Sequence, residues 1–204
     1  MDPQPSVWKS TLEEFHAQIA QGDGITGAVA VASMAAAFAV SLMLMVLEIT
    51  ARKKESEGHR RQIQELLEAA RTEAQHLKRA ADDDRAAYAA YRQAARLPQA
   101  GERQRAERQR AMRSTLEQAS ETPLRAARSA VRTIELCAQA ATLVRGDIAA
   151  DIAGAAEILH GAVRAILASL DANLRRMEDG GLVAERRELE ERASHFVERV
   201  RSHT

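Results

Sequence analysis

The sequence predicts an all-α protein that folds as an antiparallel bundle of five to six helices. Among its 204 residues are only ten glycines and four prolines, and Ala, Leu, Arg and Glu dominate. These residues favour helices because they lose little side-chain freedom there. Apolar residues recur at helical spacing, and no alternating run typical of a strand occurs. We expect a single domain over residues 1–204, with 180–204 as a peripheral C-terminal helix.

The first predicted helix covers residues 7–20. One of its faces is apolar and carries Leu12, Phe15 and Ile19. The Gly-Asp-Gly sequence at 22–24 is expected to end it, since closely spaced glycines interrupt helices.

The second predicted helix begins in the segment 25–47, which contains no charged residue, and continues toward Lys54. Its many small residues suit a helix buried inside a bundle or across a dimer interface. Its length also reaches the roughly 20 residues that cross a bilayer, and Arg52 and Lys53 follow it as basic residues follow a membrane span. The alternative of a membrane-anchored protein therefore stays open, although an alanine-rich segment is only marginally lipophilic.

The third predicted helix starts near Arg60 and stops before Pro98, because proline disfavours helix in the residue before it. The segment 101–118 is dense in Arg, Glu and Gln, which predicts a solvated connecting helix ordered only at its far end. Thr122 and Pro123 are expected to form the N-cap and first position of a new helix.

The last two predicted helices follow the break at Gly146. Apolar residues keep a 3.6-residue rhythm from Ile148 to about residue 179, where Gly180 and Gly181 are expected to end the helix. A charged helix over 183–201 completes the chain.

The charge balance and the cysteine content exclude several classes of protein. Lys plus Arg equals Asp plus Glu, and aromatic residues make up 3% of the chain. Neither observation favours binding to nucleic acid or to an acidic membrane. The lone Cys137 excludes an internal disulfide and suits a reducing compartment, so we expect a cytoplasmic protein.

Several short stretches occur in a fixed order. They are Leu12-Glu13-Glu14-Phe15, the small-residue segment 28–47, Arg52-Lys53, the acidic stretch Asp82-Asp83-Asp84-Arg85-Ala86-Ala87-Tyr88, Leu97-Pro98, Glu121-Thr122-Pro123-Leu124, Ala150-Asp151 and Asn173 with Asp179. Together they resemble the family of formiminotetrahydrofolate cyclodeaminases and methenyltetrahydrofolate cyclohydrolases, over most of Leu12 to Asp179. The sequence departs from the family pattern in a shortened glycine loop over 22–28, and in Ser169 where the family has an asparagine.

The resemblance implies a homodimeric enzyme whose substrate is a one-carbon derivative of tetrahydrofolate, with no metal or other cofactor. It identifies Asp84 as the catalytic acid. Helical spacing independently places Asp84, Tyr88 and Tyr91 on one face, whereas Asp82 lies roughly 200° around the helix. The substrate-binding residues that we carry over are Thr26, Gly27, Arg52, Lys53, Asp82, Tyr88, Asp151 and Asn173.

Structural explanations compete with several of these assignments. Arg52 and Lys53 would clamp the glutamate tail of folate, or would simply close a buried helix with polar residues. Asp151 would contribute to the substrate site, or its negative charge would interact favourably with the helix dipole from the first turn of a helix. Asn173 would bond the pterin edge or face water.

The activity we expect is hydrolysis of 5,10-methenyltetrahydrofolate to 10-formyltetrahydrofolate. It is preferred because formimino-folate would otherwise have to be made elsewhere, since no transferase domain is fused to this sequence. The alternatives are cyclodeamination of formiminotetrahydrofolate, with loss of ammonia, and a non-catalytic folate-binding or scaffold relative.

Overall fold

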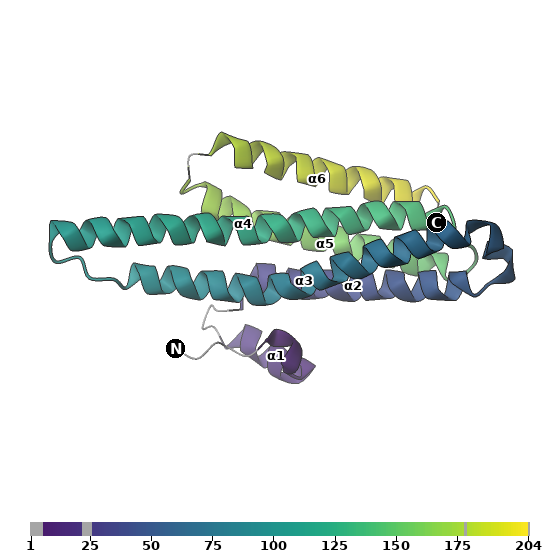
Figure 1. Ribbon diagram of the computed structural model, residues 1–204, viewed down its shortest axis with the longest axis horizontal. Helices are drawn as coiled ribbons and strands as arrows, with labels where there is room; N and C mark the ends of the chain where they lie inside the picture. Colours follow the sequence, from purple (N-terminus) through teal and green to yellow (C-terminus); the bar gives the residue numbers. More distant parts are fainter. Residues whose placement is uncertain (1–5, 22–25, 178, 204) are drawn as a thin grey trace.

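The structure, a computed structural model, describes residues 6–21, 26–177 and 179–203. All regular elements within these ranges are helical, which confirms the predicted fold class (Figure 1). In chain order they are the 3-10 helix η1 (Val7–Lys9), α1 (Leu12–Ala20), α2 (Ala28–Ala51), the 3-10 helix η2 (Lys54–His59), α3 (Arg60–Ala95), α4 (Glu102–Ala141), α5 (Ala149–Leu174) and α6 (Gly180–Arg201).

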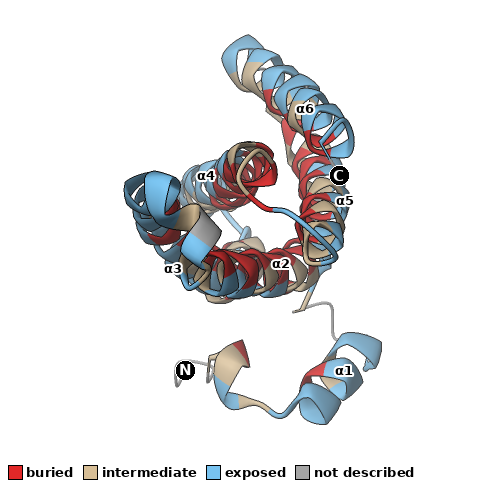
Figure 2. Ribbon diagram, turned by 90° about the vertical axis from the view of Figure 1, so that its right-hand side faces the viewer, coloured by how far each residue is buried: buried red, intermediate tan, exposed pale blue. Residues whose placement is uncertain are grey.

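Helices α2 to α5 form the body of the molecule. Each packs against two neighbours, in the pairs α2 with α3, α3 with α4, α4 with α5, and α5 with α2. Short connections between long helices make successive helices antiparallel, so α2 and α5 also run in opposite directions. Helix α6 packs on α4 and α5, outside this group (Figures 1 and 2).

Helix α2 is a core helix rich in small residues. Ala30, Ala36, Ala39 and Val40 are fully buried or nearly so, and alanines allow neighbouring backbones to approach closely. By length and composition alone, α2 and α5 are both apolar enough to cross a membrane. In the bundle, however, 61% of the most apolar window of α2 is buried against other helices.

Helix α4 corrects one prediction. The chain does not begin a new helix at Thr122 and Pro123, because α4 runs without interruption from residue 102 to residue 141 with Pro123 inside it. Proline lacks an N–H, so the carbonyl of Ala119, four residues earlier, loses its usual donor. The side-chain amide of Asn173 in α5 donates to that carbonyl instead, at 3.0 Å. A hydrogen bond from a neighbouring helix thus satisfies the free carbonyl, and α4 continues through a position where the local sequence predicts a helix boundary.

The N-terminal region corrects a second prediction, since residues 7–20 form two elements. Thr11 begins α1 with a capping box, in which its hydroxyl accepts from the Glu14 N–H and the Glu14 carboxylate accepts from the Thr11 N–H. Of the predicted apolar face only Phe15 is buried, while Leu12 and Ile19 are exposed. The predicted breaker at 22–24 lies outside the described residues.

The sequence predicts a break at each end of α5, and the one at Gly146 agrees with the structure. Gly146 has a φ of 81°, in the left-handed region that glycine tolerates, and it separates α4 from α5. Gly180 and Gly181 were expected between the last two helices, but they form the first turn of α6. The Asp179 side chain makes this possible, because it caps the N–H groups of Gly181 and Leu182.

Candidate active site

A cavity of about 230 Å³ opens between the N-terminus of α2, the C-terminal third of α3, the first half of α4 and the C-terminal end of α5. The N-terminus of α2 lies beside the C-terminal end of α5 because the two helices are antiparallel. The lining residues are Gly27, Ala28, Val29, Asp84, Tyr88, Tyr91, Leu116, Ala119, Ser169, Ala172, Asn173 and Arg176. The lining combines one carboxyl group, two phenols, one guanidinium, one carboxamide and one aliphatic hydroxyl with an otherwise small or apolar wall.

Asp84 is the titratable group whose pKa the cavity changes most clearly. Burial raises its pKa from 3.8 to about 6, while a hydrogen bond from the backbone N–H of Ala30 acts in the opposite direction. Ala30 lies in the first turn of α2, where Gly27 provides no side-chain cap. The carboxylate therefore takes the place of a capping group at a helix N-terminus. At neutral pH both protonation states of Asp84 are accessible.

The other polar groups of the cavity come from α3 and α5. Tyr88 and Tyr91 follow Asp84 by one and two turns on the same face of α3, as their spacing predicts. Arg176 donates a hydrogen bond to the Tyr91 hydroxyl at 3.3 Å. The amide nitrogen of Asn173 is engaged with α4, which leaves its oxygen as the atom that a ligand would meet.

Four of the nine predicted site residues line this one cavity: Gly27, Asp84, Tyr88 and Asn173. Thr26 precedes Gly27 in the chain but is not among the lining residues.

Asp82 faces away from the cavity, as the angle between it and Asp84 indicates. Its carboxylate accepts hydrogen bonds from the Ser6 hydroxyl at 2.5 Å and from the Val7 N–H at 2.9 Å. It thereby anchors the N-terminal segment to α3, and its assignment to the substrate does not fit this geometry.

Arg52, Lys53 and Asp151 lie at the opposite end of the bundle. Arg52 and Lys53 directly follow α2, and Asp151 lies in the first turn of α5. The 24 residues of α2 separate them from the cavity, a distance of about 36 Å at 1.5 Å per residue. Within a single chain these three residues therefore cannot contact a ligand held at Asp84.

Sequence reasoning missed several lining residues. Arg176 lies just past the end of α5 and follows Asn173 by three residues, a spacing that continues one face of the helix and would have identified it. Leu116 carried no such signal, because it lies in the segment 101–118 that composition predicts to be solvated, and Ala119 directly follows that segment. Ser169 also lines the cavity, at the position where the sequence departs from the family's asparagine.

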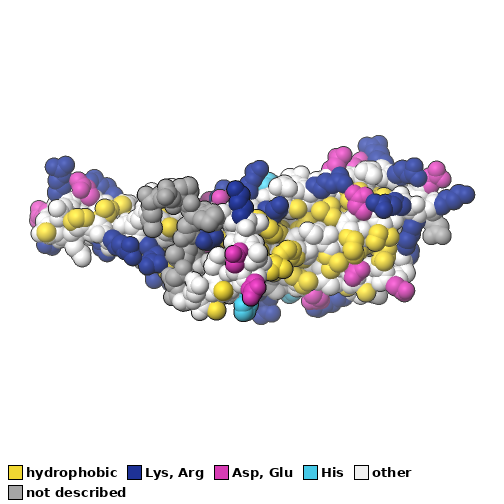
Figure 3. Space-filling view, turned by 90° about the horizontal axis from the view of Figure 1, so that it is seen from below, with side chains coloured by type: hydrophobic (Ala, Val, Ile, Leu, Met, Phe, Trp, Pro, Cys, Tyr) yellow, Lys and Arg dark blue, Asp and Glu magenta, His cyan; other side chains and the backbone are white. Residues whose placement is uncertain are grey.

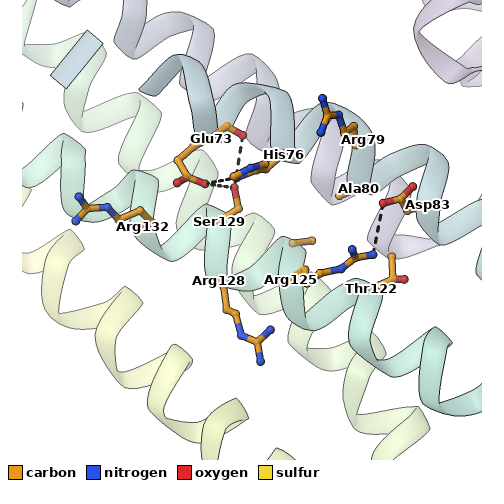
Figure 4. Close-up of a pocket in the computed structure, with 11 residues that line it drawn as sticks. Glu73, His76, Arg79, Ala80, Asp83, Thr122, Arg125, Arg128, Ser129 and Arg132 are labelled. Atoms are coloured by element: carbon orange, nitrogen blue, oxygen red, sulfur yellow. Dashed lines mark hydrogen bonds and ion pairs between the residues drawn. The ribbon is translucent and has the colours of Figure 1, made fainter. Parts of the chain in front are cut away.

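A larger cavity of about 560 Å³ lies between α3 and α4 (Figure 4). Most of its charged groups are already paired, as in Arg125 with Asp83 and Arg128 with Glu121 and Glu185. In Figure 4 the labelled arginine side chains point in different directions and do not converge on one point. We therefore place the candidate site in the smaller cavity with Asp84.

The described residues contain no group of three His, Cys, Asp or Glu side chains that could hold a metal ion. Asp84 gives the site a single carboxyl group that can do acid–base work, in a partly enclosed space with two tyrosines in its wall. A helical bundle with such a cavity between its central helices is typical of a small-molecule enzyme.

The chain belongs to the formiminotransferase-cyclodeaminase family, whose sequence profile matches residues 11–192. Among solved structures, the chain is similar to formiminotetrahydrofolate cyclodeaminase from Thermotoga maritima, with a TM-score of 0.87 and 22% sequence identity. That match covers 97% of this chain and 96% of the other. A search of the curated proteins found no match.

Proposed function

We propose that this protein is a cytoplasmic enzyme that closes the ring of 5-formiminotetrahydrofolate, with release of ammonia, to give 5,10-methenyltetrahydrofolate. The observation that carries the proposal is the position of Asp84, a carboxyl group with a pKa of about 6 inside a partly enclosed cavity. The family and the structural neighbour support cyclodeamination over the hydrolysis that we expected from the sequence.

The reaction needs one proton to be delivered at the right atom. Folate nitrogen N10 bonds to the formimino carbon as its C=N bond becomes single, the proton of N10 passes to the former imine nitrogen, and the bond from that carbon to the resulting amine nitrogen then breaks. The departing amine takes a proton from the Asp84 carboxyl group and leaves as ammonia. The carboxylate that remains stabilises the positive charge of the new methenyl bridge in a water-poor site.

The size of the cavity suits one end of the substrate. At about 230 Å³ it is smaller than the roughly 300–1,000 Å³ of sites that enclose a whole drug-sized ligand. We infer that the pterin end enters between Tyr88 and the small residues of α2 and α5. The aminobenzoyl-glutamate end then extends out of the cavity past Arg176, a cation suited to carboxylates.

A second activity, hydrolysis of 5,10-methenyltetrahydrofolate, is favoured by the same pKa. A group with a pKa of about 6 is mostly ionised at pH 7.5, and a carboxylate can take a proton from water as the water oxygen bonds to the bridge carbon. The hydroxyl proton is then released to water as the carbonyl group forms, the bond to N5 breaks, N5 receives the proton held by Asp84, and 10-formyltetrahydrofolate is formed.

One assay separates the two activities. Purified protein is given each substrate in turn, and the absorbance of the methenyl bridge is followed together with ammonia. Cyclodeamination raises the absorbance and releases ammonia from the formimino substrate, and its rate falls as the pH rises above about 6 because the acid is lost. Hydrolysis lowers the absorbance of the methenyl substrate, and its rate increases through the same pH range.

The Asp84→Asn variant should lose roughly 100- to 10,000-fold in rate, as expected when a general acid or base is removed. Asp83→Asn is the matched control, because Asp83 is the adjacent residue but is exposed and faces the other cavity. If the folded wild-type protein leaves both substrates at their uncatalysed rates, the catalytic proposal fails, and a non-catalytic relative remains.

A further inference from the structure

The N-terminal segment, residues 6–20, is fixed to α3 by hydrogen bonds. Asp82 of α3 accepts two of them, from the first two residues of the segment. The indole of Trp8 donates a third to the carbonyl of Lys78 at 2.8 Å, and the Lys78 ammonium lies 5.2 Å from the centroid of the same ring system. The start of the segment, which includes η1, is therefore bound to one turn of α3.

The same segment packs on the first turns of α2. Trp8 meets the ring of Phe38 in α2 edge to face, with 5.9 Å between the ring centroids. A cluster of apolar side chains, each no more than 8% exposed, joins the segment to α2 and α3, and it consists of Val7, Phe15, Ala30, Met34 and Ala81. The segment covers only part of this side of the bundle, since hydrophobic side chains remain in view beyond it (Figure 3).

Ala30 connects this cluster to the candidate site. Its side chain is fully buried in the cluster, while its N–H donates a hydrogen bond to the Asp84 carboxyl group. Ala30 is the third residue of α2, and the N–H groups of the first turn have no acceptor within their own helix. The bond to Asp84 therefore depends on how the first turn of α2 is held, and the N-terminal segment packs on that turn.

We propose that Asp82 is a positioning residue. By fixing Ser6 and Val7 to α3, it keeps the N-terminal segment packed on α2 and holds the Ala30 N–H against the Asp84 carboxyl group. The consequence for catalysis rests on the function proposed above, whereas the effect on the hydrogen bond does not.

Asp82 is the contact on which the segment depends most. Each oxygen of its carboxylate receives one donor from the segment, and hydrogen bonds to a carboxylate are stronger than those between neutral groups. Helix α1 adds little, because only Phe15 is buried in it, while Leu12 and Ile19 are 70% and 39% exposed. Loss of Asp82 would leave two donors without their acceptor and would release the start of the segment.

Helix α3 gives the two carboxyl groups a fixed relation. Asp82 and Asp84 are two residues apart in one continuous helix, and they lie on different sides of it. One of them binds the N-terminal segment, and the other binds the first turn of α2. A shift of the segment relative to α3 therefore moves Ala30 relative to Asp84.

The cavity contains few other groups that can interact with Asp84. Its other titratable or charged lining residues are Tyr88 and Tyr91 on α3 and Arg176 beyond α5, and the lining from α2 and α4 is uncharged. Burial raises the pKa of Asp84, and the Ala30 N–H acts against it. A displaced N–H would leave the effect of burial unopposed and raise the pKa further.

Hydrogen exchange measured by NMR tests the positioning role without any substrate. Asp82→Ala should raise the exchange rate of the Ala30 amide about tenfold, because the N–H loses its acceptor. Asp84→Ala, which removes the acceptor itself, gives the rate of the unbonded amide for comparison. Asp83→Ala is the matched control and should leave the rate unchanged, because Asp83 is exposed and pairs with Arg125.

Buried amides in the middle of α5 report whether the fold is intact. A wild-type rate for Ala30 in folded Asp82→Ala would overturn the proposal, and so would an equal acceleration of Ala30 and of the α5 amides. If Asp82→Ala does not fold, Ser6→Ala decides, because it removes one of the two donors. It should accelerate exchange of Ala30 less but in the same direction, and an unchanged rate there would overturn the proposal.

Kinetics tests the consequence for catalysis. At pH 5, where Asp84 is mostly protonated, Asp82→Ala should lower kcat of cyclodeamination about 10- to 100-fold, because the proton donor is misplaced. KM should stay nearly constant, since Asp82 does not line the cavity. The loss of rate with rising pH should begin at a higher pH than in wild type, because the pKa of Asp84 is higher.

An unchanged kcat, a change in KM alone, or an unmoved pH profile would overturn the catalytic role of Asp82. If the wild-type protein converts neither folate, the function proposed above fails. The exchange rate of Ala30 still decides in that case whether Asp82 positions the N–H at Asp84.

Discussion

At the scale of the residue, two opposing effects set the pKa of Asp84. Burial disfavours its charge, and the N-terminus of α2 favours it through the Ala30 N–H. Because the pKa is higher in the folded protein than the value of 3.8 for a free side chain, ionisation of Asp84 favours the unfolded state. The group therefore costs the protein stability at neutral pH, as expected for a carboxyl group retained for chemistry.

Asp84→Asn should consequently stabilise the protein while it abolishes activity. The gain should be absent near pH 4, grow as the pH rises to about 6, and stay constant above that, at on the order of 1–3 kcal/mol. Denaturant unfolding of wild type and variant across pH 4–8 measures it. Asp83→Asn is the control, because Asp83 is exposed and lies outside this cavity. A gain that is independent of pH would contradict the explanation.

At the scale of the element, Pro123 and Asn173 are linked. The proline deprives the Ala119 carbonyl of a donor within α4, and the Asn173 amide replaces that donor from α5. The bond also fixes the Asn173 side chain at the wall of the cavity. Asn173 thus has a structural role alongside the ligand-binding role that the sequence suggests.

Asn173→Leu should destabilise the protein by about 1–3 kcal/mol, because it leaves a partly buried carbonyl without a side-chain partner. In a Pro123→Ala background the restored backbone N–H can serve the Ala119 carbonyl, so the same change should cost less. A double-mutant cycle measured by denaturant unfolding should give a coupling of about 0.5–2 kcal/mol. Additive effects would show that the two residues are independent.

At the scale of the whole molecule, stability comes from the helices that close around the common core. Leu159 is fully buried in the middle of α5, whereas Val183 on α6 is 44% exposed. Leu159→Ala should cost about 2–5 kcal/mol and lower the Tm by several degrees. Val183→Ala should stay within about 0.5 kcal/mol. Similar losses for both variants would mean that the core does not lie where the structure places it.

The sequence by itself determined those elements that depend only on a pattern of neighbouring residues. Helical periodicity predicted the long helices α3 and α5 and the break at Gly146, because an apolar face repeats every 3.6 residues wherever a helix packs on a core. The same spacing placed Tyr88 and Tyr91 beside Asp84 and placed Asp82 on another side of α3. These relations depend only on the geometry of one helix.

Only the tertiary structure decided what depends on contacts between helices. Pro123 lies inside α4 because Asn173, fifty residues later, satisfies the carbonyl that the proline leaves free. Arg52 and Asp84 lie a helix length apart because α2 runs between them. The order of motifs in the sequence does not reveal this separation. The cavity itself exists because antiparallel packing joins the start of α2 to the end of α5. Such contacts bring together residues that are distant in the chain, so no local pattern could predict them.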